Sequence, residues 1–239
     1  MPDLSARILA VSSVDPASRE AMYGLLARYY DDTDRQRFHE DLSRKDHVIV
    51  LRDRHGGLRG FSTLQRLVVE VDGVRHRGVY SGDTVVDQAG WGQGVLGRAF
   101  LRYLLVARAR HPLSPLWWFL ISKGYKTYLL MANNFAEHWP RHELPTPRWA
   151  DDLRLAFGRA LFGDLVDAES LVIRFPQPAG RVRDGVAVID DELRAREPRV
   201  RFFERQNPGW QRGDELICVA RMSWTLPFAY AWKKTWGSR

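Results

Sequence analysis

The fold is decided by the stretch Val85-Val86-Asp87-Gln88-Ala89-Gly90-Trp91-Gly92-Gln93-Gly94-Val95-Leu96-Gly97-Arg98-Ala99-Phe100. The end of an apolar strand is followed by a glycine-rich turn and by the start of an amphipathic helix. Glycines let the backbone turn tightly, and the first N–H groups of the helix point at any anion in the turn. The stretch therefore predicts a phosphate cradle. It lacks the Gly-Lys-Ser/Thr of a Walker loop. It also lacks the strand-helix-strand unit at the N-terminus and the acidic residue at the end of a second strand that accompany a dinucleotide fingerprint.

The same stretch resembles motif A of the GCN5-related N-acetyltransferase (GNAT) superfamily. Val86 matches the valine at the strand end, and Gly92-Gln93-Gly94-Val95 matches the Gly-x-Gly-Ile core. Two positions depart, because Trp91 replaces an Arg or Gln and Leu96 replaces a Gly or Ala. The resemblance implies that the turn binds the pyrophosphate of acetyl-CoA or another acyl-CoA. The coenzyme-binding residues that it implies are Val85, Val86, Trp91, Gly92, Gln93, Gly94, Val95, Leu96, Gly97 and Arg98.

The order of the predicted elements supports the resemblance. The first 110 residues predict a strand, two helices, three strands, the glycine turn and a helix, and Asp72-Gly73 predicts the turn of a hairpin. The apolar run Leu116-Trp117-Trp118-Phe119-Leu120-Ile121 predicts a parallel strand that is covered on both faces. Together with the resemblance, this order implies an α/β (α+β) fold. Its mixed, mostly antiparallel sheet carries a splayed parallel pair and has helices on both faces.

The second half of the chain follows the family less closely. The pattern predicts helices at 123–134, 151–162 and 190–197 and strands at 171–175, 200–203 and 215–224. A GNAT domain closes with two antiparallel strands, so residues 141–198 are interpreted as an insertion before them. We expect one domain over 1–239, with an aromatic tail at 225–239.

Composition limits the class of protein. The chain has 239 residues, 45% of them apolar, one cysteine and a net charge of +7. No apolar stretch has the ~20 residues of a membrane span, no signal peptide is recognisable, and a lone cysteine suits the cytoplasm. The basic charge attracts either nucleic acid or an anionic ligand such as CoA, unless it only reflects a GC-rich genome. Because no long Lys/Arg cluster is present, we expect no nucleic-acid partner.

Acyl transfer to an amine requires a polarised carbonyl and a base that removes a proton from the ammonium. The resemblance implies that the backbone N–H near Val85 or Val86 polarises the thioester. Asp83 is the candidate base, with Glu70 as a weaker rival, and the alternative is an Asp paired with an Arg. Strand alternation places Ser81, Asp83 and Val85 on one face.

Other candidate residues are interpreted with their structural alternatives. In GNAT enzymes a tyrosine after the fifth strand protonates the thiolate, and Tyr128 is nearest to that place, with Tyr125 as the alternative. Either ring equally suits a core position. His138 and His142 have the spacing of a zinc helix, but Pro140 breaks it and no third ligand follows, so no metal is expected. Cys218 is interpreted as a buried core thiol.

The C-terminal tail has an aromatic period of four residues, Trp224, Phe228, Trp232 and Trp236. This stripe is expected to pack on the protein itself or on a second subunit, which would make a homodimer. The sequence as a whole predicts an acyl-CoA-dependent N-acyltransferase that moves an acyl group to the amine of a small molecule by direct attack. The alternative is a catalytically inactive GNAT-like protein that binds a ligand or partner.

Overall fold

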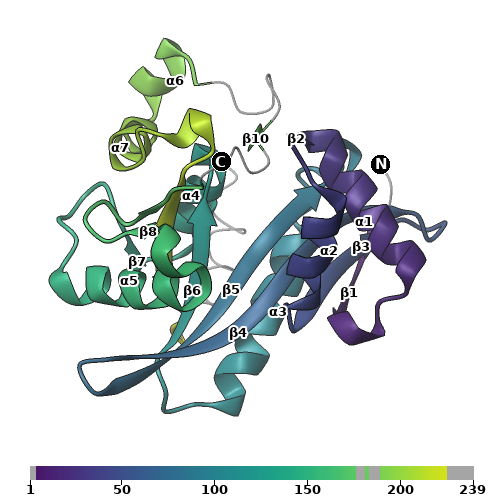
Figure 1. Ribbon diagram of the computed structural model, residues 1–239, viewed down its shortest axis with the longest axis horizontal. Coiled ribbons are helices and arrows are strands. Elements are labelled where there is room, and N and C mark those ends of the chain that lie inside the picture. Colours follow the sequence, from purple (N-terminus) through teal and green to yellow (C-terminus); the bar gives the residue numbers. More distant parts are fainter. Residues whose placement is uncertain (1–3, 176–180, 183–188, 225–239) are drawn as a thin grey trace.

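A computed structural model describes residues 4–175, 181–182 and 189–224. One mixed sheet runs through the molecule (Figure 1), in the order β1-β3-β4-β5-β6-β11-β9-β8, with β7 paired to β11. Its pairs are antiparallel except β5–β6, which is parallel. The predicted mixed, mostly antiparallel sheet with one parallel pair is confirmed. The strands of this sheet are β1 Ser5–Ala10, β3 His47–Arg52, β4 Leu58–Val71, β5 Val74–Val86, β6 Leu116–Ser122, β7 His138–Trp139, β8 Val166–Asp167, β9 Val172–Ile173 and β11 Glu215–Arg221.

Helices cover both faces of the sheet, because its strands alternate apolar side chains toward each face. Val48 and Val50 pack with α1 and α2, whereas Ile49 and Leu51 pack with α3 and α4 on the opposite face. Helix α5 covers the α1–α2 face further along the sheet, and α7 joins α3 and α4. The helices are α1 Pro16–Tyr29, α2 Arg35–Ser43, α3 Val95–Arg110, α4 Tyr125–Asn134, α5 Arg148–Phe162, α6 Asp191–Arg196 and α7 Pro198–Gln206.

Helix starts follow local capping chemistry. Asp15 and Asp34 accept hydrogen bonds from the N–H groups of Ser18 and Arg37, and Pro16 occupies the first position of α1. Each aspartate satisfies a donor that the first helical turn leaves without a partner. A short second sheet pairs β2, Tyr30–Asp31, with β10, Arg181–Val182. None of the helices in the described ranges is long and apolar enough to cross a bilayer.

One predicted strand is wrong. Residues 200–203 lie in helix α7, not in a strand. Val200 and Phe203 are buried three positions apart, while Arg201 is exposed, which is helical spacing. Pro198 begins the helix and Glu197 caps it. The strands that flank β11 are therefore β6, β7 and β9, and not a strand at 200–203.

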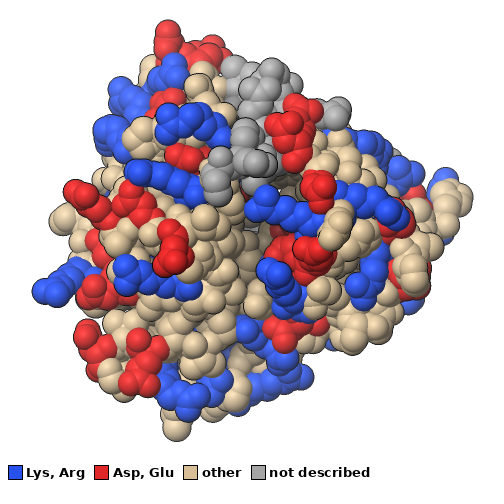
Figure 2. Space-filling view, in the orientation of Figure 1, with Lys and Arg blue, Asp and Glu red and all other residues tan. Residues whose placement is uncertain are grey.

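The structure describes most of the segment that was predicted to be an insertion, but not the tail. Within 141–198, α5 packs on the sheet and β9 extends it beside β11, and the assignment of 141–198 as an insertion stays a prediction. The tail at 225–239, with Phe228, Trp232 and Trp236, lies outside the described residues, and so does the homodimer expected from it. On the face with α1, α2 and α5, basic and acidic side chains are interspersed (Figure 2).

Candidate functional site

A β-bulge interrupts β5 next to the predicted base. Ser81 lies opposite Leu64 and Thr84 opposite Ser62, so Gly82 and Asp83 together face the single residue between them on β4. An extra residue shifts the alternation of side chains along the strand that carries it. The bulge thus separates side chains that regular alternation would place together.

The predicted shared face of Ser81, Asp83 and Val85 is wrong for this reason. The Ser81 hydroxyl accepts a hydrogen bond of 2.8 Å from the indole nitrogen of Trp118, in the cluster that packs with α3 and α4. Val85 is buried in the opposite cluster with α1 and α2. Regular alternation would have kept Ser81 and Val85 on the same side.

The parallel strands β5 and β6 separate at the bulge. Their pairing runs from Arg77 opposite Leu116 to Ser81 opposite Leu120. Beyond it β5 continues to Val86 and β6 to Ser122, without further pairing between the two strands in the described residues. A parallel pair that opens in this way exposes strand-edge backbone groups, which can bind an extended ligand arm.

The glycine turn links the open end of β5 to helix α3. Gly92 and Gly94 have φ angles of +78° and +65°, a region that glycine enters without the steric cost of a Cβ. Gly94 is the N-cap of α3 and offers no side-chain acceptor. The first N–H groups of α3, from Val95 to Gly97, have no acceptor within the helix, so they are free to bind an anion together with the positive end of the helix dipole.

Trp91, the first departure from the family pattern, braces this turn. Its indole nitrogen donates a hydrogen bond of 2.8 Å to the carbonyl oxygen of Val86 at the end of β5. The Lys126 ammonium, at the start of α4, lies 5.8 Å from the centre of its ring. Arg98 reaches back over the turn and donates to the carbonyl oxygen of Gln93 at 3.0 Å. Two cations therefore flank the turn although none replaces Trp91 itself.

Leu96, the second departure, lines a small apolar pocket. A pocket of about 200 Å³ lies beside the turn, and it is lined by Leu4, Leu51, Val86, Gly90, Trp91, Gly92, Gly94, Val95 and Leu96. Apolar side chains make up most of its wall. The pocket can bind an apolar group next to the anion-binding N–H groups.

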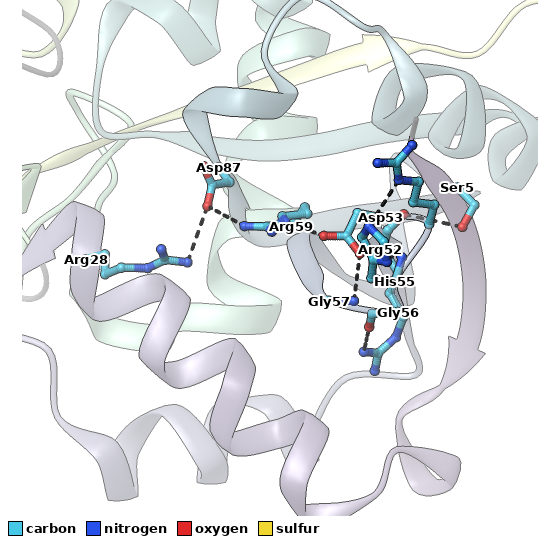
Figure 3. Close-up of polar contacts among 10 residues, drawn as sticks. Ser5, Arg28, Arg52, Asp53, His55, Gly56, Gly57, Arg59 and Asp87 are labelled. Carbon is cyan, nitrogen blue, oxygen red and sulfur yellow. Dashed lines mark hydrogen bonds and ion pairs between the residues drawn. The ribbon is translucent and has the colours of Figure 1, made fainter. Parts of the chain in front are cut away.

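A chain of charges fixes the strand end that precedes the turn (Figure 3). Asp87 lies 3.5 Å from Arg28 of α1 and 3.8 Å from Arg59 of β4, and Arg59 also binds Asp53 at 2.7 Å. The backbone N–H of Gln88 donates to the Tyr29 hydroxyl at 3.0 Å. These contacts join α1 and β4 to the turn, so the turn is held on both sides.

Asp83 lies half-buried among charges from distant parts of the chain. Burial, followed by the charge of Asp41, raises the pKa of its carboxyl to about 6, and the cations of Lys45 and Lys123 oppose this shift. A carboxylate with a pKa near neutrality is suited to general-base catalysis. Asp83 therefore has the electrostatics of a base.

Two ion pairs surround Asp83. Lys45 binds Asp41 at 3.0 Å, and its ammonium lies 5.1 Å from the ring centre of Tyr80. Lys123 binds Glu215 at 3.3 Å, and burial raises the pKa of Glu215. No sequence pattern could have identified these lysines, because Lys45 lies in the loop after α2 and Lys123 directly follows β6.

The two candidate tyrosines are both on α4 but differ in burial. Tyr128 is fully buried against Phe202 and Phe203 of α7, and its hydroxyl donates to the carbonyl oxygen of Pro140 at 3.3 Å. Burial raises its pKa well above the usual range. Tyr125, in the first turn of α4, is 9% exposed. The structural alternative thus fits Tyr128 better than the role of an acid.

The remaining candidates are part of the core or its surroundings. His138 is buried and its Nδ1 pairs with the carbonyl oxygen of Phe135 at 2.8 Å, whereas His142 is exposed. No group of three potential metal ligands occurs among the described residues. Cys218 is fully buried, and burial raises the pKa of its thiol to about 12, which confirms the core thiol.

No protein-family model matches the sequence, and a comparison with curated proteins found no match. Solved structures do resemble it. A GNAT-family N-acetyltransferase from Escherichia coli, in complex with CoA, is 19% identical with a TM-score of 0.39, over 59% of this chain and 78% of that one. A ribosomal-protein-alanine N-acetyltransferase from Brucella melitensis is 19% identical with a TM-score of 0.43, over 60% of this chain and 100% of that one.

A probable N-acyltransferase from Enterococcus faecalis is 15% identical with a TM-score of 0.43, over 68% of this chain and 43% of that one. These solved structures are therefore similar to the chain at low sequence identity. The bulge of β5, the separation of β5 from β6 and the glycine turn are observed in this chain independently of those comparisons.

Proposed function

We propose that the protein is an acyl-CoA-dependent N-acyltransferase that acts on an amine of a small molecule. The observation that carries this proposal is the position of Asp83 at the bulge, where β5 and β6 separate and only a few residues before the glycine turn. The unpaired edge of β5 thereby connects the Asp83 carboxylate, whose pKa is raised, to the glycine turn that is expected to bind an anion.

The donor is expected to bind along this edge. Its pyrophosphate would accept hydrogen bonds from the N–H groups of the turn and of the first turn of α3, with Arg98 and Lys126 adding positive charge. Its pantetheine arm would lie between the separated ends of β5 and β6. Because Trp91 supplies no charge, backbone N–H groups supply most of the phosphate recognition.

The chemistry is a direct transfer. The Asp83 carboxylate removes a proton from the acceptor ammonium, and the neutral amine then attacks the thioester carbonyl and forms the new C–N bond. The backbone N–H near Val85 or Val86 stabilises the oxyanion of the tetrahedral intermediate. Collapse of the intermediate breaks the C–S bond and releases the CoA thiolate, which gains a proton from Tyr125 or water. The nitrogen of the new amide gives up its second proton to the tyrosinate or hydroxide that this leaves, which restores the donor. We retain Tyr125 rather than Tyr128 for this role because Tyr128 has no exposed surface and its hydroxyl is bonded to Pro140, whereas Tyr125 keeps 9% of its surface exposed.

The first test is donor binding. Thermal shift and calorimetry with CoA, acetyl-CoA and a longer acyl-CoA should show stabilisation, because a ligand that binds only the native state raises its stability by mass action. The absence of binding at millimolar concentrations of all three would contradict the proposal.

The second test separates an enzyme from a protein that only binds CoA. Release of CoA thiol is followed in the presence of a panel of small amines. Asp83→Asn is expected to lower turnover by about 10²-fold or more while CoA binding stays unchanged. The matched control is Glu70→Gln, an exposed carboxylate on β4, which should retain full turnover. Binding without turnover for any amine would favour the inactive alternative.

A further inference from the structure

A second, larger groove lies on the α3 face of the sheet, away from Asp83. Its volume is about 1140 Å³, and it runs between α3 and the strands β1, β3, β4 and β5. Tyr103 of α3 and His47 of β3 meet at the groove, where the tyrosine hydroxyl lies 3.1 Å from the histidine Nδ1. The groove shares Val95 and Arg98 with the region of the glycine turn but extends along the whole of α3.

Arginines from both walls give the groove its charge. Arg102 and Arg110 come from α3, and Arg66 and Arg77 come from β4 and β5. Arg66 pairs with Asp46 at 3.2 Å, whereas Arg77, Arg102 and Arg110 have no ion pair within the described part of the chain. The charges of Arg66 and Arg110 both help to lower the pKa of His47, after burial. Arginines on opposite walls of the groove therefore both exert their positive charge on the His47 ring.

The walls between the arginines are apolar. Val68 of β4 is 44% exposed and Val106 of α3 is 45% exposed, and both line the groove with Ile8 and Ala99. Large apolar side chains exposed inside a charged groove favour a ligand that has apolar groups of its own. Single-stranded nucleic acid is bound instead by exposed aromatic rings. In this groove Tyr103 and His47 are bonded to each other and Tyr103 is buried, so the exposed ring is the imidazole of His111 at the end of α3, and no exposed Phe, Tyr or Trp lines the groove among the described residues.

We propose that this groove binds an acidic peptide segment of a partner protein, in which carboxylates alternate with apolar side chains. The carboxylates pair with Arg77, Arg102 and Arg110, and the apolar side chains contact Val68 and Val106. A nucleic-acid duplex is bound by a protein element that protrudes into its groove. This site is concave, so its shape also excludes a rigid duplex as the ligand. The inference stands independently of the acyl transfer proposed above.

The test uses the full chain and two labelled probes. One is a short peptide of alternating glutamate and valine, and the other is oligothymidylate. Fluorescence anisotropy should show that the peptide binds and that added salt weakens the binding, because ion pairs at an open groove are screened. A peptide with glutamine in place of glutamate should bind at least about tenfold more weakly. The His47 ring resonances should shift on addition of the glutamate peptide.

Variants then locate the site. The double variant Arg102→Glu/Arg110→Glu should weaken peptide binding by about tenfold or more. The matched control Arg201→Glu/Arg205→Glu makes the same change of charge at two exposed arginines of α7 that have no ion pair in the described residues, and it should bind as the wild type does. Val106→Ser should weaken peptide binding by a few-fold without altering the charge. Circular dichroism confirms that each variant is folded, and CoA binding should persist in all of them.

Three results would overturn the inference. The first is no peptide binding at millimolar concentration. The second is peptide binding that Arg102→Glu/Arg110→Glu and Arg201→Glu/Arg205→Glu weaken equally, since net charge alone would then account for it. The third is oligothymidylate that binds more tightly than the peptide and depends on Arg102 and Arg110, which would make the groove a nucleic-acid site.

Discussion

The indole nitrogen of Trp91 and the carbonyl oxygen of Val86 are joined by a hydrogen bond of 2.8 Å, which closes the glycine turn onto the end of β5. In the motif that this turn resembles, a cation or an amide occupies the position of Trp91. Here the side chain braces the backbone instead, and its half-exposed ring lies next to the Lys126 ammonium. Trp91 thus fixes the backbone of the turn but contributes no positive charge to it.

This relationship predicts the effects of two substitutions at Trp91. Trp91→Phe keeps a ring but removes the N–H donor, so the free energy of unfolding should fall by about 1 kcal/mol and CoA should bind more weakly. Trp91→Arg restores a cation next to the pyrophosphate and should tighten CoA binding, as measured by calorimetry. Trp149→Phe, on α5, is the control and should not change CoA affinity. Unaltered CoA binding in Trp91→Phe would show that the brace is not needed for the anion site.

Asp83 predicts a specific dependence of turnover on pH. Because its carboxyl has a pKa of about 6, kcat/KM should rise through pH 6 as the base loses its proton. The limb near pH 6 should be absent in Asp83→Asn and present in Glu70→Gln. A wild-type profile without this limb would mean that another group accepts the proton from the amine.

The same pKa predicts that the stability of the protein depends on pH. The folded state raises the pKa of Asp83 above its ordinary value of 3.8, so it binds the proton more tightly than the unfolded state does. The contribution of Asp83 to the free energy of unfolding therefore falls as pH rises from about 4 to about 6, and it stays low above pH 6.

Asp83→Asn removes this penalty. The variant should be more stable than the wild type by about 1–2 kcal/mol at pH 7 and equally stable below pH 4. Urea denaturation at the two pH values measures the difference. Destabilisation at pH 7 would indicate that the Asp83 carboxylate makes a favourable ion pair in the folded state.

The parts of the fold that local chemistry determines could be predicted from the sequence. The hairpin turn at Asp72-Gly73 and the start of α3 after Gly94 both depend on residues close together in the chain. The bulge could not be predicted, because it depends on how β5 pairs with β4. Regular alternation then placed Ser81 and Val85 on one face, which was wrong.

The site around Asp83 shows the same limit. Its lysines and carboxylates come from α2, the loop after it, the end of β6 and β11, and no spacing in the sequence relates them. The helix α7 was a different kind of failure. The sequence contains Pro198 and the helical spacing of the apolar residues Val200 and Phe203, but the short apolar run was interpreted as a strand.

The glycine turn predicts the effect of a single methyl group. Gly94 has a φ angle of +65°, and a Cβ there would lie 3.3 Å from Nη1 of Arg98. Gly94→Ala should therefore lower the free energy of unfolding by about 1 kcal/mol and weaken CoA binding. Gly24→Ala is the control, because Gly24 lies inside α1 with open space around it, and it should raise stability by up to about 1 kcal/mol. Equal effects of the two substitutions would contradict the conformational argument.

A close approach between β5 and α5 predicts a strongly coupled pair. A Cβ at Gly78 would lie 2.6 Å from Cε1 of Phe157, which is fully buried. Gly78→Ala should destabilise the protein by about 1–3 kcal/mol through overpacking, and Phe157→Ala by about 3–5 kcal/mol through the cavity that it leaves. In the double variant the new methyl group enters that cavity, so the loss measured in urea should be smaller than the sum of the two. If the two losses in the free energy of unfolding are additive, α5 does not pack against β5 as closely as the distance indicates.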